Sequence, residues 1–220
     1  MAAHHCNGEK YCLIAAALFF SVASPGAIQH TYAQTAQDVV IAVENHYRDL
    51  TDLTAKVLQQ NVLKSIGKTQ TFEGTLFIKK PGRLRLEYSN GQLILIDGKA
   101  ALFYSKKSEQ VIKKTFTDFE QMNIPVAFLL GAARIRDEFD VQQADPKTPR
   151  ELELLPRKPG AAMKKMRLRV DDAGRITDLT IFDRSGNTTA IAFTDIREGA
   201  GVDDQRFVFK APKGTEIIEK

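Results

Sequence analysis

The order of hydrophobic and polar residues changes early in the chain from a helical period to an alternating one. Over residues 37–50, apolar side chains recur at every third or fourth position, which predicts one amphipathic helix. From residue 53 onwards, apolar and polar residues alternate in short segments separated by turn residues, which predicts a series of β-strands. Tight hairpin turns are predicted at residues 89–91 and 97–99, so the strands that they join should be antiparallel.

One segment, residues 117–133, interrupts this alternation. Asp118 can cap a short helix there and Pro125 can begin another, so we predict a helical insertion. The whole pattern predicts a mainly β (α+β) fold with about eleven strands and two or three helices. A long antiparallel meander without crossover helices buries one face by closing into a barrel or stacking as a sandwich. The first helix and the insertion could lie across an open side of the curved sheet, as a lid over a hollow.

The strand predicted at residues 83–88 separates apolar from charged side chains. Leu84 and Leu86 lie on one face, and Arg83 and Arg85 lie on the other. The next strand, residues 92–96, is apolar on both faces, so we expect it to be central and covered on both sides. A hollow lined with hydrocarbon and an ordinary packed core both explain such apolar faces, and periodicity alone does not separate them.

The N-terminal residues 1–33 have the features of a secretory signal peptide. Lys10 precedes an apolar run over residues 11–23, and small residues follow up to Ala33. The run is shorter than the roughly 20 residues that a membrane-spanning helix needs. We predict cleavage after Ala33, with Ala23 as the alternative, and a single exported domain over residues 34–220.

Cleavage changes which side chains are available for chemistry. Both cysteines lie in the leader, and His46 is the single histidine that remains after it. Thiol catalysis, a serine–histidine pair and a histidine-rich metal site are therefore hard to build. Paired carboxylates such as Asp203 and Asp204 remain, but turns and solvated faces explain them more simply. We expect no enzymatic activity, no metal and no cofactor.

The charge of the chain is mild. A net charge of +4 at neutral pH is more typical of solubility than of a specific anionic partner. Lys79, Lys80, Arg83 and Arg85 gather on one predicted hairpin, but no aromatic platform accompanies them. Together with export, this argues against nucleic-acid binding and leaves a basic rim that could meet an acidic protein.

Several short motifs follow one another in an order that is typical of one protein family. They are Phe72-Glu73-Gly74, Lys79-Lys80-Pro81-Gly82-Arg83, Asp97-Gly98-Lys99, Asn123-Ile124-Pro125, Asp172-Ala173-Gly174-Arg175-Ile176 and Phe207-Val208-Phe209. Each motif alone is only a good turn or strand end. As an ordered series behind an export signal, from about Asp38 to Lys220, they resemble the outer-membrane lipoprotein carrier family, LolA.

This resemblance implies an incomplete antiparallel β-barrel in which short helices form a lid over a hydrophobic cavity. It also implies a periplasmic chaperone that binds the acyl chains of lipoproteins and moves them from the inner to the outer membrane. The implied partners are acylated lipoproteins, an inner-membrane ABC-type lipoprotein-releasing complex and an outer-membrane acceptor lipoprotein, and we expect a monomer. A lipid-sensing module or a free-lipid-binding protein of the same fold is the alternative, which the sequence does not separate from a carrier.

Two positions depart from the pattern of the family. Lys80 stands where the family commonly has an arginine that holds the lid, and a lysine lacks the planar fork of donors. Leu86 stands where the family often has tryptophan, so the cavity should differ in shape. We expect Lys80 to be the lid latch, and we expect the cavity and lid to be lined by Val43, Tyr47, Leu50, Leu76, Ile78, Leu84, Leu86, Tyr88, Leu93, Leu95, Val126, Phe128 and Leu129.

Overall fold

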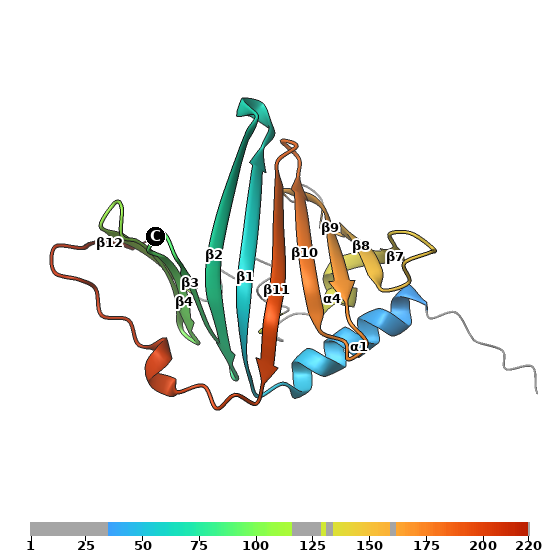
Figure 1. The fold of residues 1–220 in the computed structure, drawn as a ribbon, viewed down its shortest axis with the longest axis horizontal. Coiled ribbons are helices and arrows are strands. Elements are labelled where there is room, and N and C mark those ends of the chain that lie inside the picture. The colour runs from blue at the N-terminus through green and yellow to red at the C-terminus, as the bar shows by residue number, and fades with distance from the viewer. Residues whose placement is uncertain (1–34, 116–128, 131–133, 159–161, 220) are drawn as a thin grey trace, which may run out of the picture. The chain divides into compact units, whose positions relative to one another are not determined.

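The computed structural model describes residues 35–115, 129–130, 134–158 and 162–219 (Figure 1). Helix α1 (Ala36–Asp49) is capped by Thr35, whose Oγ1 accepts a hydrogen bond from the Asp38 backbone N–H at 3.2 Å. The Asp38 carboxylate in turn accepts one from the Thr35 N–H at 3.0 Å. This reciprocal cap satisfies N–H groups that the first helical turn leaves without partners. Within the described ranges, no helix has the length and apolar character needed to span a bilayer.

Twelve strands form one sheet. The strands are β1 (Asp52–Leu63), β2 (Lys68–Lys79), β3 (Arg83–Tyr88), β4 (Gln92–Asp97), β5 (Ala100–Ser105), β6 (Gln110–Thr115), β7 (Phe139–Gln143), β8 (Glu151–Pro156), β9 (Met163–Val170), β10 (Ile176–Asp183), β11 (Thr188–Glu198) and β12 (Glu216–Glu219). Short helices lie between some of them: η1 (Lys64–Ile66), α4 (Ile135–Glu138) and η2 (Asp204–Phe207).

The strand order is β12-β6-β5-β4-β3-β2-β1-β11-β10-β9-β8-β7. Two antiparallel meanders, β1–β6 and β7–β11, are joined in the middle by the antiparallel pairing of β1 with β11. At one edge, β12 pairs in parallel with β6, and β7 forms the other edge. The two edges do not pair with each other, so the sheet stays open. This unclosed sheet with few helices confirms the predicted mainly β fold class.

Most of the predicted strands are confirmed to within a few residues, but the C-terminal region differs. Phe207 lies in the short helix η2 and not in a strand, because Asp203 caps this helix through a hydrogen bond from the Gln205 N–H at 3.0 Å. Strand β12 is not predicted by alternation, since its residues are too few to show a period. Of the predicted insertion over residues 117–133, only residues 129–130 lie within the described chain.

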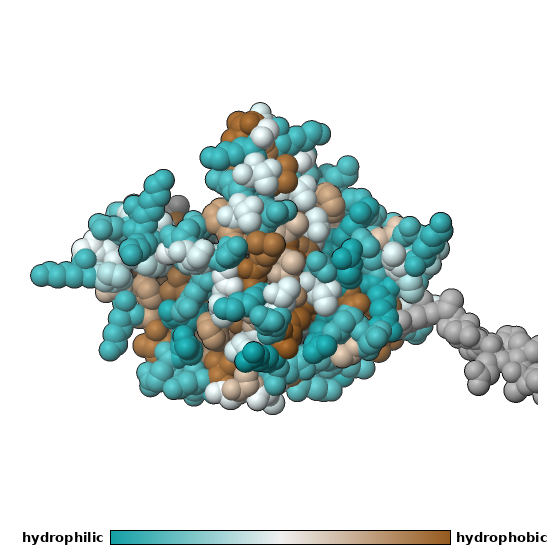
Figure 2. Space-filling view, in the orientation of Figure 1, coloured by the Kyte–Doolittle hydropathy of each residue, from teal (hydrophilic) through white to brown (hydrophobic). Residues whose placement is uncertain are grey.

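The β1–β2 hairpin projects beyond its neighbours and ends in η1 (Figure 1). Ile66 at this tip is 67% exposed. Figure 2 shows hydrophobic residues at the tip and in patches between hydrophilic residues below it.

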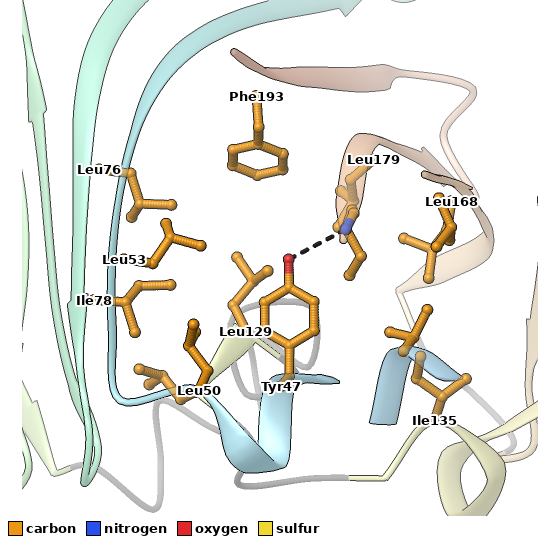
Figure 3. Close-up of a cluster of buried hydrophobic side chains, with 14 of the residues drawn as sticks. Tyr47, Leu50, Leu53, Leu76, Ile78, Leu129, Ile135, Leu168, Leu179 and Phe193 are labelled. Atoms are coloured by element: carbon orange, nitrogen blue, oxygen red, sulfur yellow. Dashed lines mark hydrogen bonds between the residues drawn. The ribbon is translucent and has the colours of Figure 1, made fainter. Parts of the chain in front are cut away.

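Helix α1 packs on one side of the sheet, which we call the inner face. It buries Val39, Val40, Val43 and Tyr47 in the main core. Figure 3 shows Tyr47 at the centre of this core, where its hydroxyl accepts a hydrogen bond from the Ile176 backbone N–H at 3.2 Å. The helix is thereby joined to the start of β10.

A smaller core lies on the opposite, outer face. Leu93 and Leu95 of β4 pack there against Val202 and Phe207 from the C-terminal segment. The Arg83 guanidinium lies 5.7 Å from the centre of the Phe207 ring. The C-terminal segment therefore covers an apolar part of the sheet that would otherwise face water.

Candidate functional site

A row of apolar side chains crosses strands β1 to β6 on the inner face. The strand register aligns Ala55, Leu76, Leu86, Ile94, Phe103 and Ile112, one from each strand. Residues that pair directly across a sheet point to the same side, so these side chains form one continuous surface, which we call the apolar row.

The inner face is filled on the α1 side of the apolar row. The side chains next to the row are at most 3% exposed, and they are Leu53, Ile78, Leu84, Ile96 and Ala101. Leu129 and Leu130 are buried in the same core. Figure 3 shows Leu53, Ile78 and Leu129 around the helix residues Tyr47 and Leu50. This end of the interior is therefore packed.

A cavity of about 420 Å³ lies toward the other end of the inner face. Its apolar lining comes from Phe72, Tyr88, Ile94, Phe103 and Ile112, and amide side chains supply most of the remainder. The volume falls within the roughly 300–1,000 Å³ that is typical of sites for small molecules. The apolar row thus continues from a packed core into a hollow.

Gly74 gives Tyr88 its place in the cavity wall. A Cβ at residue 74 would lie 2.7 Å from the Glu87 carbonyl oxygen and 3.2 Å from the Tyr88 ring, so a side chain there would require a backbone shift. The Tyr88 hydroxyl donates a hydrogen bond to Gln59 Oε1 at 2.5 Å, and its ring meets Phe72 edge-on. Burial raises the pKa of Tyr88 to about 12, so the hydroxyl stays a neutral donor.

Lys80 links the β2–β3 turn to the residues that cover the core. Its Nζ donates a hydrogen bond to the Leu130 carbonyl oxygen. Burial lowers the pKa of Lys80, because a charged ammonium group is less stable away from water.

The structure places most of the expected site residues on the inner face, but few of them line the cavity. Those in the inner core are Val43, Tyr47, Leu50, Leu76, Ile78, Leu84, Leu86 and Leu129. Tyr88 lines the cavity itself. Val126 and Phe128 lie outside the described residues.

Leu93 and Leu95 of β4 lie apart from the expected site residues of the inner core. Both belong to the core on the outer face, although Leu93 also contributes to the cavity lining. Ile94 and Ile96 are the members of β4 that join the inner core. Because all four side chains are apolar, alternation within β4 cannot tell the two faces apart.

Sequence reasoning missed several residues of the cavity wall. Phe72, Ile94, Phe103 and Ile112 line it from four different strands. The predicted hairpin turn at residues 89–91 could have identified the inward side chains of β4. It sets Leu86 opposite Ile94, and residues that pair across the two strands face the same side.

The cavity lining is apolar and amide-bearing, and it contains no charged side chain. Across the described parts of the chain, no group of three His, Cys, Asp or Glu residues is placed to hold a metal ion. Such a wall can bind hydrocarbon and can accept or donate neutral hydrogen bonds.

Comparison with known proteins gives matches over most of the chain. A family model for the outer membrane lipoprotein carrier protein LolA matches residues 48–210. The outer-membrane lipoprotein carrier protein of Chromohalobacter salexigens is 27% identical over 165 residues, which cover 73% of this chain and 78% of that protein. The protein of the same name from Chromobacterium violaceum is 29% identical over 155 residues, which cover 69% and 74%.

A solved structure resembles the fold. An uncharacterized conserved protein from Thermus thermophilus has a TM-score of 0.51 and 14% sequence identity, with 84% of this chain and 99% of that chain covered. At this level of identity, the similarity concerns the fold alone.

Proposed function

The chain belongs to the LolA family of outer membrane lipoprotein carrier proteins, and we propose that it carries lipoproteins from the inner to the outer membrane by binding their acyl chains on the inner face. The observation that carries this proposal is the apolar row, which continues from the core into a cavity of about 420 Å³. Each methylene group removed from water contributes about 0.8 kcal/mol of stabilisation. Binding on the apolar inner face can therefore offset much of the free-energy cost of exposing the acyl chains to water.

We propose that Leu129 and Leu130 belong to a movable cover and that Lys80 is its latch. Both leucines are buried, and the Lys80 hydrogen bond to Leu130 holds them on the core. Acyl chains that enter the packed end of the inner face would have to displace them. An equilibrium between closed and open forms lowers the apparent affinity in proportion to the open fraction, which makes release possible without a nucleotide.

The exported state of the protein is part of the proposal. Residues 1–33 act as a signal peptide that is removed after Ala33 or Ala23, and the remaining chain works in the periplasm as a monomer without catalytic activity. An inner-membrane ABC-type complex supplies the lipoprotein, and an outer-membrane acceptor lipoprotein receives it. Transfer then follows the differences in affinity between donor, carrier and acceptor.

Mass spectrometry of the protein isolated from a periplasmic extract tests the nature of the cargo. We expect triacylated proteins to copurify with it. Free lipids without any lipoprotein would contradict the carrier and would favour a lipid-binding protein of the same fold.

A pair of substitutions tests the site. Ile94→Glu places a carboxylate in the apolar row, so we expect loss of binding to a triacylated peptide. Leu58→Glu makes the same change on an exposed position of β1, where the side chain is 42% exposed, and should leave binding intact. Equal binding by both variants would place the cargo elsewhere.

A further inference from the structure

Amide side chains gather at the end of the cavity away from α1. Gln59 and Asn61 come from β1, Gln70 from β2, Gln92 from β4 and Gln110 from β6, and all five line the cavity. We call these five residues the amide end. The inner face is therefore polar at one end and aliphatic at the other, where the residues that pack against α1 begin.

Hydrogen bonds within the protein occupy part of the amide end. Gln59 accepts from the Tyr88 hydroxyl and donates to Asn61 Oδ1 at 3.0 Å. Gln92 accepts from Asn90 Nδ2 at 3.0 Å. Gln110 Nε2 donates to a Glu216 carboxylate oxygen at 2.7 Å. These contacts involve four of the five amides and leave Gln70 without one.

Asn61 and Gln70 keep amide donors that no other described residue uses. Over the described chain, Gln70 makes no side-chain hydrogen bond and Asn61 Nδ2 donates none. Asn61 and Gln70 pair directly across β1 and β2, so their side chains stand next to each other on the inner face. Each carboxamide NH₂ group can donate two hydrogen bonds.

The chemistry of the wall selects a neutral acceptor. No charged side chain lines the cavity, whereas recognition of phosphate or carboxylate groups commonly uses lysine or arginine. Ester and amide carbonyls are neutral acceptors, and they sit where a fatty chain meets its polar head. A ligand with fatty chains and such carbonyls matches both ends of the inner face, because its chains fit the aliphatic end and its carbonyls fit the amide end.

Building on the carrier function proposed above, we propose that Asn61 and Gln70 bind the carbonyl groups that link the fatty chains of the cargo to its cysteine headgroup. The chains then run along the strands and across the apolar row toward the aliphatic end, and the attached polypeptide leaves near the tip of the β1–β2 hairpin. The cargo is therefore bound in a single orientation, with its headgroup at the amide end and its chains toward α1.

Equilibrium binding to the unmodified mature protein tests this assignment. The probes are a synthetic tripalmitoylated cysteinyl peptide and its analogue in which ether links replace the two esters. We expect the ester form to bind about tenfold more tightly, the effect of one or two neutral hydrogen bonds. Equal binding of the two peptides would overturn the assignment and leave the carrier function standing. Failure of both peptides to bind would overturn the assignment and the carrier function together.

Variants locate the preference on the two amides. Asn61→Leu combined with Gln70→Met keeps the side-chain size and removes the donors, so the ester preference should vanish while the ether analogue binds as before. Gln60→Met makes a similar change on the exposed face of the same strand and should keep the preference. A preference that survives in the double variant would contradict the assignment.

A second pair of probes separates the two sources of such carbonyls. Dipalmitoylglycerol and its diether analogue carry the glyceryl links without the peptide. An ester preference in this pair as well would assign the site to glyceryl esters in general, and a preference restricted to the peptide pair would assign it to lipoproteins.

Discussion

At Lys80, one ammonium group joins the β2–β3 turn to Leu130. Lys80→Met keeps the length of the side chain but leaves the Leu130 carbonyl oxygen without this donor. We expect the free energy of unfolding to fall by about 1–2 kcal/mol, measured by urea denaturation. Lys80→Arg retains a donor and should lose less. An equal loss in both variants would mean that the hydrogen bond does not hold the leucines in place.

Glu153 on β8 makes the stability depend on acid pH. The hydrogen bond from Lys165, at 2.7 Å, is the main reason that the pKa of Glu153 lies below its ordinary value of 4.5, and Arg167 adds to it. Since the folded state holds the proton less tightly than the unfolded chain, this stabilisation is complete above the ordinary pKa. It is lost as the pH falls through the lower pKa of the folded state.

Glu153→Gln tests this dependence. We expect the variant to lose about 1 kcal/mol at neutral pH and to show a smaller decrease between neutral pH and about pH 3 than the unmodified protein. Urea denaturation at both pH values measures the difference. Asp140→Asn, at an exposed ion pair with Arg157, should change stability by less than about 0.5 kcal/mol. Parallel pH curves for Glu153→Gln and the unmodified protein would contradict the assignment.

Among the structural elements, the C-terminal segment packs on the outer face mainly through the buried side chain of Phe207. Phe207 is 5% exposed and packs on Leu93 and Leu95. Phe207→Ala should detach the segment from the outer face, so we expect much faster proteolysis of residues 199–219 and a loss of up to about 3 kcal/mol.

The neighbouring residue provides a matched control. Val208 is 50% exposed, and Val208→Ala should leave both the proteolysis rate and the stability nearly unchanged. Similar proteolysis of the two variants would show that the segment is held by its polar contacts, such as the hydrogen bond from Lys79 Nζ to the Val202 carbonyl oxygen.

The elements differ in how far the sequence predicts them. Hairpin strands were predictable because alternation and turn residues are local signals, as at residues 89–91 between β3 and β4. The pairing of β1 with β11 was not, because no local pattern fixes the register of strands so far apart in the chain. The sequence predicted that residues 92–96 are covered on both faces. It did not predict that Val202 and Phe207 provide the outer cover, because these residues reach β4 only in the folded chain.

For the candidate site, the sequence predicted an apolar inner face but few of the residues that line the cavity. Leu84 and Leu86 indicated an apolar inner face, and that face is present. Its polar end was not predicted, because Gln59, Asn61 and Gln70 look like ordinary exposed strand residues until the register sets them side by side.

For the whole molecule, cargo and stability should be linked. A triacylated peptide that binds only the folded chain should raise the apparent free energy of unfolding by about 2.7 kcal/mol at about 100 times its Kd. Thermal denaturation with and without the peptide measures this shift. Ile94→Glu should show no shift, and a shift of equal size in that variant would place the peptide outside the apolar row.

The union of the two meanders through β1 and β11 has a consequence for the nascent protein. Synthesis delivers β1 early and β11 near the end, so one side of β1 has no strand to pair with for most of that time. Unpaired backbone N–H and C=O groups on a strand invite pairing with other chains. The ladder at the centre of the finished sheet is thus the last of the β1 contacts to form, and the growing chain needs protection until it does.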